Sequence, residues 1–333
     1  MRILVAGGAG FIGSNFIHYI LEKYPEDYVV NLDKLTYAGN PANLADLVGS
    51  PRYHFIQGDI ADNETVVKAL TGIDAVVNFA AETHVDRSIH VGSRDFVMAN
   101  VLGVQTLLDA ERKQGGVRHI QVSTDEVYGS LELDDPSQFT EETPFAPNVP
   151  YAAAKAGGDL LCRAFSKTFG SDVIVTHCSN NYGPYQFPEK LIPFFIDRAL
   201  SGEQLPLYGD GKNVRDWLYV RDHCSALDTI LRSGKAGEVY NIGGNAEKPN
   251  IEIAGHILRI LGKSESLITF VTDRPGHDRR YAIDASKLRR ELGWEPATTF
   301  EDGIAETVQW YRDHAEWVAD VKRRISDINE HLR

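Results

Sequence analysis

Residues 3–13 of the chain read ILVAGGAGFIG, an apolar run followed by glycines at Gly7, Gly10 and Gly13. The run predicts a buried strand, and residues 11–24 have the pattern of a helix. Glycines at such a junction allow a tight turn and a close approach of backbone to phosphate. The N-terminus of the helix adds unpaired N–H groups and a positive dipole end. The stretch therefore predicts a dinucleotide-binding turn, the alternative being a glycine turn with a structural role alone.

Short apolar segments recur along the first half of the chain. After residues 3–6, we expect strands at residues 28–32, 53–56, 75–79, 119–123 and 172–176. These segments do not alternate polar with apolar residues, which indicates burial on both faces, as in a parallel sheet covered by helices. Repeated β-α-β order with right-handed crossovers gives a doubly wound, Rossmann-type α/β sheet.

The pattern loosens after about residue 178, where prolines become frequent. Residues 239–242 are expected to form a strand that returns to the main sheet, and residues 251–261 and 304–317 to form helices. A length of 333 residues suits about two domains. We expect a dinucleotide-binding domain at residues 1–178, with a returning segment near 217–242. Residues 179–333 would form a smaller, partly discontinuous substrate domain.

Charge and cysteine content argue against several classes of protein. The chain has 34 Lys+Arg against 47 Asp+Glu, a net charge of −13, so nucleic acid and anionic membranes are not expected partners. No apolar run approaches the roughly 20 residues of a membrane-spanning helix. Cys162, Cys178 and Cys224 form no CxxC pair, which favours buried free thiols over disulfides or metal ligands. Without a signal-peptide pattern, we expect a cytoplasmic protein that binds no metal.

Two acidic residues that follow predicted strands indicate which dinucleotide is bound. Asp33 lies 20 residues after Gly13, where a carboxylate can bind the adenosine ribose hydroxyls and would repel a 2′-phosphate. NAD is therefore favoured over NADP, although the neighbouring Lys34 weakens that inference. Asp59 follows the third strand, where it can meet the adenine amino group or cap the next helix.

Tyr151 and Lys155 stand at positions i and i+4 of a predicted helix that follows Pro150. A cation close to a phenol favours the phenolate, which makes tyrosine a usable base near neutral pH. The alternative is a surface tyrosine beside a solvated lysine. The glycine fingerprint earlier in the chain favours the catalytic interpretation.

The glycine pattern, Asp33 and the Tyr151–Lys155 pair resemble the extended short-chain dehydrogenase/reductase family over nearly the whole chain. The resemblance implies that the tyrosine removes a proton from a sugar hydroxyl while tightly bound NAD accepts hydride from the same carbon. It also implies that the lysine binds the nicotinamide ribose. The cofactor contacts that it implies are made by Gly7, Gly10, Phe11, Ile12, Gly13, Asp33, Lys34, Leu35, Thr36, Asp59, Ile60, Ala80, Ala81, Tyr151, Lys155 and Asn181.

Asp125 and Glu126 follow the strand at residues 119–123, so their side chains are expected at the ligand-binding edge of the sheet. Adjacent carboxylates repel each other, and one of them can keep a proton at neutral pH. An acid beside a base is what the elimination of water requires. The alternative is that one of the two caps a helix.

These two acids, in the run TDEVYG at residues 124–129, also resemble the dehydratase branch of the family. Further matches are AAETHVDRS at 80–88, NNYGPY at 180–185, PEKLIP at 188–193, LYGDG at 207–211, RDW at 215–217 and DRPGHDRRY at 273–281. The resemblance implies conversion of dTDP-glucose to its 4-keto-6-deoxy derivative plus water. Two alternatives remain: a nucleotide-sugar 4-epimerase, and a non-catalytic sensor of NAD.

In this branch Tyr151 is implied to deprotonate the 4-hydroxyl group and Thr124 to bind the 4-oxygen. Glu126 would remove the C5 proton while Asp125 protonates the departing 6-hydroxyl. The substrate contacts that the resemblance implies are Thr83, Thr124, Asn180, Lys190, Leu191, Pro206, Tyr208, Arg215, Asn250, Arg274, His277 and Tyr281. For Arg274 a salt bridge is the alternative, and for Tyr208 ordinary packing.

The apolar helical stretches at residues 96–110 and 152–169 have two interpretations. Family members often form homodimers through two such helices per subunit, which predicts a homodimer here. Alternatively, the two helices only cover the sheet.

Overall fold

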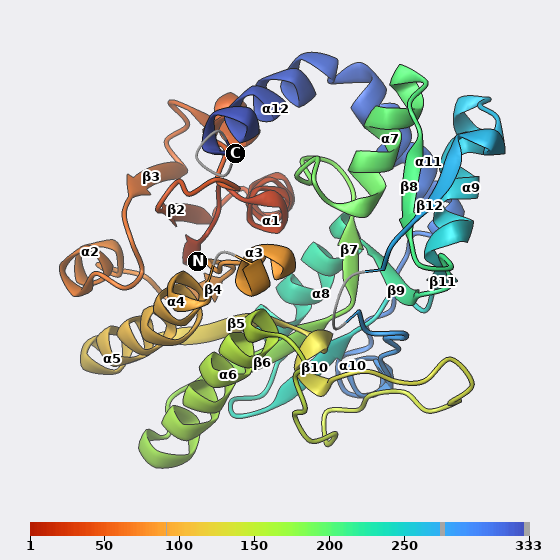
Figure 1. The fold of residues 1–333 in the computed structure, drawn as a ribbon. Coiled ribbons are helices and arrows are strands. Elements are labelled where there is room, and N and C mark those ends of the chain that lie inside the picture. The colour runs from red at the N-terminus through yellow and green to blue at the C-terminus, as the bar shows by residue number, and fades with distance from the viewer. Residues whose placement is uncertain (91, 274–276, 330–333) are drawn as a thin grey trace.

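The computed structural model describes residues 1–90, 92–273 and 277–329, and its largest element is a seven-stranded parallel sheet (Figure 1). The strand order is β10 (Val239–Ile242), β6 (Val173–Cys178), β5 (Arg118–Thr124), β4 (Ala75–Asn78), β1 (Arg2–Ala6), β2 (Tyr28–Asp33) and β3 (Tyr53–Gln57). β10 pairs with β6, so the chain returns to this sheet late in the sequence. The predicted doubly wound α/β class is confirmed.

Helices cover both faces of the main sheet because the side chains of each strand alternate between them. On one face, Ile3 and Val5 share a core with Phe16 of α1 (Phe11–Lys23) and Leu227 of α8 (Val220–Ser233). On the other face, Leu4 shares a core with residues of α2 (Asn63–Ala69) and α5 (Val104–Gln114).

α6 (Pro150–Phe169) packs beside α5 on this second face, and the two helices run side by side in Figure 1. The chain enters α5 through α3 (Val85–His90), α4 (Arg94–Val97) and one π-helical segment, η2 (Met98–Gly103). Gly158 of α6 lies so close to η2 that a Cβ atom there would stand 2.4 Å from the carbonyl oxygen of Asn100.

Most of the remaining elements gather beside the carboxyl ends of the main strands, around a second core that contains Phe195, Ile257 and Ile304. The strands are β7 (Asn180–Tyr182), β9 (Val214–Tyr219) and β11 (Glu247–Pro249) in one small sheet, and β8 (Leu205–Tyr208) and β12 (Ile268–Val271) in another. The helices are α7 (Leu191–Ser201), α9 (Asn250–Leu261), α11 (Phe300–Asp313) and α12 (Ala315–Asn329). Shorter elements are α10 (Ser286–Leu292), η1 (Pro41–Leu47), η3 (Asp125–Tyr128) and η4 (Glu265–Leu267).

The single helix predicted at residues 304–317 is wrong in its bounds. α11 begins at Phe300, because the side chain of Thr299 accepts a hydrogen bond from the backbone of Asp302. It ends at Asp313, where His314 leaves the helical conformation with φ −116° and ψ 38°, and α12 follows.

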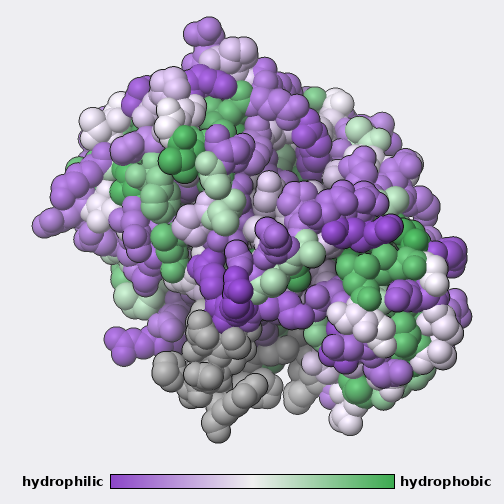
Figure 2. Space-filling view, turned by 90° about the horizontal axis from the view of Figure 1, so that it is seen from above, coloured by the Kyte–Doolittle hydropathy of each residue, from purple (hydrophilic) through white to green (hydrophobic). Residues whose placement is uncertain are grey.

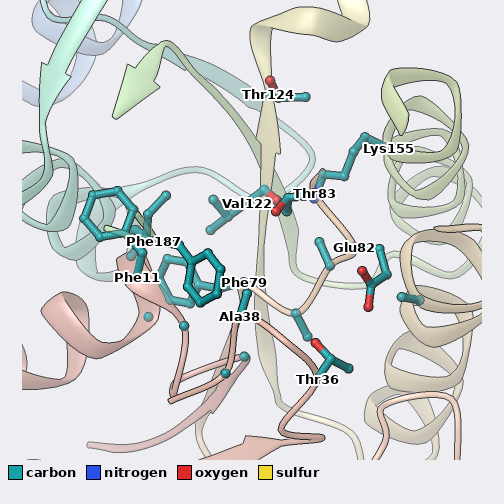
Figure 3. Close-up of a pocket in the computed structure, with 18 of the residues that line it drawn as sticks. Phe11, Thr36, Ala38, Phe79, Glu82, Thr83, Val122, Thr124, Lys155 and Phe187 are labelled. Atoms are coloured by element: carbon teal, nitrogen blue, oxygen red, sulfur yellow. Dashed lines mark hydrogen bonds between the residues drawn. The ribbon is translucent and has the colours of Figure 1, made fainter. Parts of the chain in front are cut away.

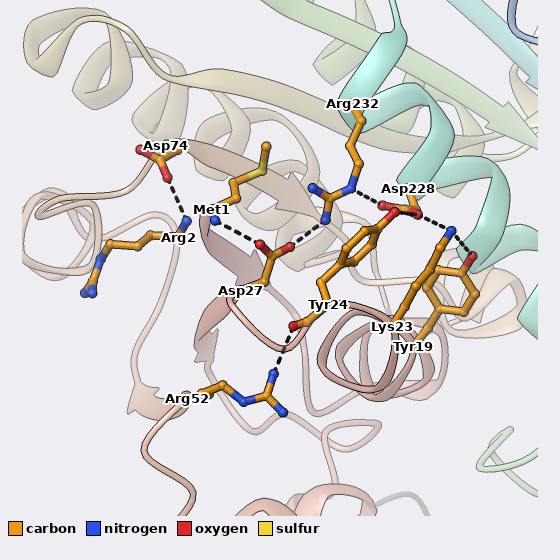
Figure 4. A network of polar contacts seen from close by, with 10 residues as sticks. All are labelled: Met1, Arg2, Tyr19, Lys23, Tyr24, Asp27, Arg52, Asp74, Asp228 and Arg232. Atoms are coloured by element: carbon orange, nitrogen blue, oxygen red, sulfur yellow. Dashed lines mark hydrogen bonds and ion pairs between the residues drawn. The ribbon is translucent and has the colours of Figure 1, made fainter.

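A network of charged side chains joins α1 to α8 (Figure 4). The buried carboxylate of Asp228 lies 2.8 Å from the ammonium of Lys23, 2.6 Å from the guanidinium of Arg232 and 2.8 Å from the hydroxyl of Tyr24. Arg232 also pairs with Asp27 at the start of β2. The network fixes α8 on the sheet beside α1.

Hydrophilic residues cover most of the face seen in Figure 2, and hydrophobic residues gather there in separate patches. Within the described parts of the chain, we find no helix with the length and apolar character needed to cross a membrane.

Candidate active site

A cleft of about 680 Å³ opens at the carboxyl ends of β1, β2, β4, β5 and β6. Residues of the second core region, including Asn180 and Lys190, form its other wall. In Figure 3, Phe11, Phe79 and Phe187 gather on one side of this cleft, and Glu82, Thr83 and Lys155 lie on the other. The carboxyl edge of a doubly wound sheet is the usual place for a ligand.

The glycine turn has the close contacts that a dinucleotide cradle requires. Gly7 has φ +77°, and a Cβ atom there would lie 2.5 Å from the backbone nitrogen of Ala80. A Cβ atom on Gly13 would lie 2.4 Å from the carbonyl oxygen of Gly7. Only glycine fits at these two positions, so the backbone and the N-terminus of α1 are open to the cleft. The turn thus fits the pyrophosphate of a dinucleotide.

Asp33 lies at the end of β2 and lines the same cleft. Its two carboxyl oxygens accept hydrogen bonds from the backbone of Leu35 (2.8 Å) and Ala9 (2.9 Å). Burial raises the pKa of Asp33, while these two bonds oppose that shift. The carboxyl group therefore ties the loop after β2 to the glycine turn and keeps acceptor capacity for ribose hydroxyls.

Asp59 does not cap the helix that follows it, because the N-cap of α2 is Asp62. Its side chain instead accepts a hydrogen bond from the backbone of Ala61 and lies 2.7 Å from the ammonium of Lys34. Lys34 is thus held by an acid in the cleft, which reduces its capacity to attract a 2′-phosphate.

Tyr151 and Lys155 lie on the first two turns of α6, and both are buried, with 7% and 4% of their surface exposed. The ammonium of Lys155 donates a hydrogen bond of 2.7 Å to the carbonyl oxygen of Val122. Burial lowers the pKa of Lys155 and raises that of Tyr151, to which the charge of Glu126 adds. A surface tyrosine beside a solvated lysine is excluded.

The turn after β5 presents Thr124, Asp125 and Glu126 to the cleft. Thr124 begins η3 by accepting a hydrogen bond from the backbone of Glu126, and it also interacts with the hydroxyl of Tyr151. Burial and then the charge of Glu126 raise the pKa of Asp125 well above its ordinary range. The Oδ2 atom of Asp125 has no hydrogen-bond partner among the described residues. Asp125 is therefore placed to hold and release a proton.

The structure brings most of the sequence-predicted residues into this one cleft. Its lining includes Gly7, Gly10, Phe11, Ile12, Gly13, Asp33, Lys34, Thr36, Asp59, Ile60, Ala80, Ala81, Thr83, Thr124, Asp125, Glu126, Tyr151, Lys155, Asn180, Asn181 and Lys190. Leu35 and Leu191 fall next to lining residues. Pro206, Tyr208, Arg215 and Asn250 stand on β8, β9 and α9 beyond it, His277 and Tyr281 lie in the chain that leads to α10, and Arg274 lies outside the described residues.

Arg215 and Tyr281, which do not line the cleft, interact through charge with Asp125 and Glu126. The positive charge of Arg215 opposes the raised pKa of Asp125, and the charge of Glu126 adds to the burial that raises the pKa of Tyr281. The guanidinium of Arg215 lies 4.1 Å from the centre of the Tyr281 ring. It donates hydrogen bonds to carbonyl oxygens of Val214 and Asp278, and it forms no ion pair with the described residues. Arg215 thus brings a positive charge close to the acids.

Sequence reasoning missed a group of side chains that bridges the two walls of the cleft. The carboxylate of Glu189 lies 3.3 Å from the hydroxyl of Tyr37 and 3.2 Å from Nε2 of His84. The Arg87 guanidinium stacks 4.5 Å from the centre of the Tyr37 ring. Tyr37 is four residues past Asp33, and only tertiary structure brings it to Glu189.

Comparison with known proteins decides the family. A family model described as GDP-mannose 4,6 dehydratase matches residues 4–307. The chain belongs to this family. Curated proteins similar to the chain belong to the dehydratase branch that the sequence motifs indicated, so the predicted resemblance is confirmed. One is a dTDP-glucose 4,6-dehydratase of Xanthomonas campestris, 54% identical over 96% of this chain and 95% of the relative.

Solved structures place this family member closer to dehydratases than to epimerases. The dTDP-glucose 4,6-dehydratase DesIV of Streptomyces venezuelae, solved with NAD and TYD bound, is 52% identical with a TM-score of 0.93, over 96% of this chain and 100% of that chain. A UDP-glucose 4-epimerase of Thermus thermophilus in complex with NAD is 30% identical with a TM-score of 0.86, over 94% and 100%.

Proposed function

We propose that the protein is a dTDP-glucose 4,6-dehydratase, an NAD-dependent hydro-lyase that forms the 4-keto-6-deoxy sugar nucleotide. The observation that carries this proposal is the meeting of an acid pair, the buried Asp125 and the half-buried Glu126, with the Tyr151–Lys155 pair in one cleft. An oxidoreductase that moves hydride at a single carbon has no need of a second acid and base. Relatives that share about half of the sequence have this activity in their names.

The glycine turn and Asp33 fit NAD, which when bound would accept hydride from C4 of the sugar and return it to C6. Gly7, Gly10 and Gly13 would hold the pyrophosphate, and Asp33 the ribose hydroxyls. The other contacts that we propose for NAD are the residues given above for the family resemblance. The buried carboxyl group of Asp33 disfavours the additional phosphate of NADP.

The first proton transfer is assigned to Tyr151, which takes the proton of the 4-hydroxyl group. Because burial opposes ionisation of the phenol, Tyr151 depends on the ammonium of Lys155 to act as a base. Thr124, which interacts with the Tyr151 hydroxyl, would bind the 4-oxygen and polarise the ketone that forms.

The elimination is assigned to the two acids. The 4-ketone acidifies the C5 proton, Glu126 removes it, and Asp125 donates its proton to the departing 6-hydroxyl so that water leaves. The C5 carbon is reprotonated after the hydride returns to C6. The raised pKa of Asp125 favours its protonated form, which an acid catalyst requires.

We propose that the second wall and the elements behind it hold the nucleotide diphosphate. The charge of Arg215, which forms no ion pair within the described part of the chain, suits a phosphate oxygen. The buried Oδ1 atoms of Asn180 and Asn250 have no partners among the described residues, which suits ligand recognition. Thr83, Lys190, Leu191, Pro206, Tyr208, Arg274, His277 and Tyr281 complete the proposed contacts. Residues 1–178 with the return through β10 would then be the cofactor domain, and residues 179–333 mainly the sugar-nucleotide domain.

Turnover of dTDP-glucose in deuterated water tests the activity. We expect a product lighter by one water, with solvent deuterium at C5, and no net consumption of NAD. A galactose epimer that keeps its 6-hydroxyl would instead identify a 4-epimerase. If the protein turned over no sugar nucleotide, the remaining alternative would be a non-catalytic sensor of NAD.

We further propose a cytoplasmic homodimer that forms through α4 to α6. Val97, Met98, Leu102, Leu160 and Phe169 are large exposed apolar residues on these helices. Cys162, Cys178 and Cys224 are free and buried, as suits a reducing compartment. We expect Leu160→Lys to halve the mass measured by light scattering, and Leu200→Lys, at an exposed position on α7, to leave it unchanged.

A further inference from the structure

A second layer of buried polar groups lies behind Lys155, formed by Ser123, Tyr128, Asp159, His177 and Asn241; we call it the inner network. The Oδ2 atom of Asp159 accepts a hydrogen bond of 2.6 Å from the Ser123 hydroxyl and lies 3.2 Å from Nε2 of His177. The Nδ1 atom of His177 lies 2.7 Å from the Tyr128 hydroxyl, which also contacts Oδ1 of Asn241 at 2.9 Å. All five residues are buried.

Three members of the inner network lie within four residues of a proposed catalytic residue along the chain. Ser123 precedes Thr124 on β5, and Tyr128 ends the η3 turn that carries Asp125 and Glu126. Asp159 lies one turn beyond Lys155 on α6, with 3% of its surface exposed. The network therefore connects the helix that bears the base to the turn that bears the acids.

Asp159 is the negative charge nearest in sequence to Lys155 on the buried face of α6. Its charge raises the pKa of Lys155 and so opposes the effect of burial. The titratable groups around it are Lys155 and Cys162 on α6, His177 on β6 and Tyr128 on η3. Those around Lys155 are Asp159, Cys162 and Cys178.

The hydrogen bonds of Asp159 leave one of its oxygens available. Both donors converge on Oδ2, whereas Oδ1 is buried and has no hydrogen-bond partner among the described residues. Leaving a buried carboxyl oxygen unsatisfied costs free energy unless another interaction compensates. Lys155, one helical turn away on α6, is a cation whose charge can offset part of this cost.

We propose that Asp159 is a positioning residue for the reaction: backed by His177 and Ser123, it provides the counter-charge that keeps Lys155 an ammonium beside Tyr151. The role rests on the proposed function, because it matters only if the Tyr151–Lys155 pair is the catalytic base. Asp159 itself touches neither sugar nor reacting atoms in this proposal.

The test is the titration of Lys155 in the purified protein, followed by NMR of ¹³Cε-labelled lysine. Lys155→Met identifies the resonance by its loss. In Asp159→Asn, we expect the Lys155 titration to move to lower pH by about one unit or more, since a nearby opposite charge shifts a pKa by about 1–3 units. We expect the alkaline limb of the kcat profile to move the same way, with KM for dTDP-glucose little changed.

Glu111→Gln is the matched control. Glu111 is also a buried acid paired with a buried histidine, since its carboxylate lies 2.8 Å from Nδ1 of His119. It is not among the groups that shift Lys155, so both readouts are expected to stay as in the wild type. Asp159→Glu, which keeps the charge, should restore the wild-type titration.

An unchanged Lys155 titration in Asp159→Asn would overturn the proposal, even if activity were lost. If that variant does not fold, the wild type alone decides: a Lys155 that is neutral at pH 7.5 refutes the proposed role, and one that is an ammonium there supports it. Failure of the proposed function would appear separately, as a wild type with a normal Lys155 titration and no dehydrated product.

Discussion

Asp125 and Glu126 are consecutive residues of one tight turn, yet Asp125 is 2% exposed while Glu126 is half-buried. The buried neighbour carries the raised pKa, with the charge of Glu126 as its second cause. The turn thus gives two chemically similar groups different environments, as the proposed roles of proton donor and proton acceptor require.

This division of roles predicts that the two acids act after the first oxidation. We expect Asp125→Asn and Glu126→Gln to lower the rate of elimination by about 10²- to 10⁴-fold, the usual contribution of general acid–base catalysis. Oxidation at C4 should persist in part, because Tyr151 and Lys155 are unchanged. Stopped-flow absorbance of the reduced nicotinamide would follow that first step. Loss of it as complete as in Tyr151→Phe would disprove the assignment.

The same burial predicts that Asp125 costs stability. A carboxyl group whose pKa is raised by folding binds its proton more tightly in the folded state, so its contribution to stability falls as pH rises above the unfolded pKa. We expect Asp125→Asn to raise the free energy of unfolding at pH 8 by about 1 kcal/mol, which corresponds to a rise in Tm of about 2 °C or more. The gain should shrink at pH 4 to 5. Equal gains at both pH values, measured by calorimetry, would rule out titration as the cause.

Asp33 is expected to decide cofactor choice. Asp33→Ala removes the acceptor at the end of β2 and frees the backbone N–H groups of Ala9 and Leu35. We expect NAD affinity to fall about tenfold or more, which corresponds to about 1.4 kcal/mol, and the discrimination against NADP to shrink. Isothermal titration of cofactor-stripped protein measures both. Asp62→Ala, an exposed N-cap on α2, serves as the control, and an equal effect there would contradict the prediction.

The link between α1 and α8 is expected to be a source of stability. Asp228→Ala leaves Lys23, Tyr24 and Arg232 without their shared buried carboxylate, and we expect a loss of about 2–4 kcal/mol in the free energy of unfolding. Glu22→Ala breaks the exposed ion pair with Arg221, which joins the same two helices, and should cost less than about 1 kcal/mol. Urea unfolding of the two variants measures both losses, and a loss in Glu22→Ala as large as that in Asp228→Ala would contradict the prediction that burial makes the difference.

The cysteines are expected to be inert in the folded protein. All three are buried, and burial raises the pKa of Cys178 to about 12. Thiolate is the reactive form, so we expect no modification by a thiol-specific disulfide reagent at pH 8 until urea is added. Rapid labelling of the native protein would show that the core opens readily.

Local pattern was sufficient to predict the main sheet. Six of its strands are short runs buried on both faces, whereas the edge strand β3 is half-exposed, so the expected two-sided burial is wrong there. The glycine turn and Tyr151–Lys155 are compact motifs whose spacing is set by one turn or one helix. The small strands β7, β8, β11 and β12 were not predicted, because they are three or four residues long and depend on partners far away in sequence.

Site residues that are close in sequence could be predicted from their motifs. Contacts between site residues that are far apart in sequence could not, because only tertiary structure brings them together. The ion pair of Lys34 with Asp59 and the bridge from Tyr37 to Glu189 join segments that share no local signal. For Asp59 the sequence left two interpretations open, contact with adenine or a cap on the next helix, and the cap is wrong because Asp62, three residues later, takes that position.

The late return of β10 to the main sheet has a consequence for how the chain folds as it is synthesised. Strand β6 ends at Cys178, but its outer neighbour begins only at Val239. Until that neighbour emerges from the ribosome, one edge of β6 has unpaired backbone groups and is open to pairing with other chains. The nascent protein is therefore expected to need most protection from aggregation during the synthesis of the sixty or so residues between these two strands.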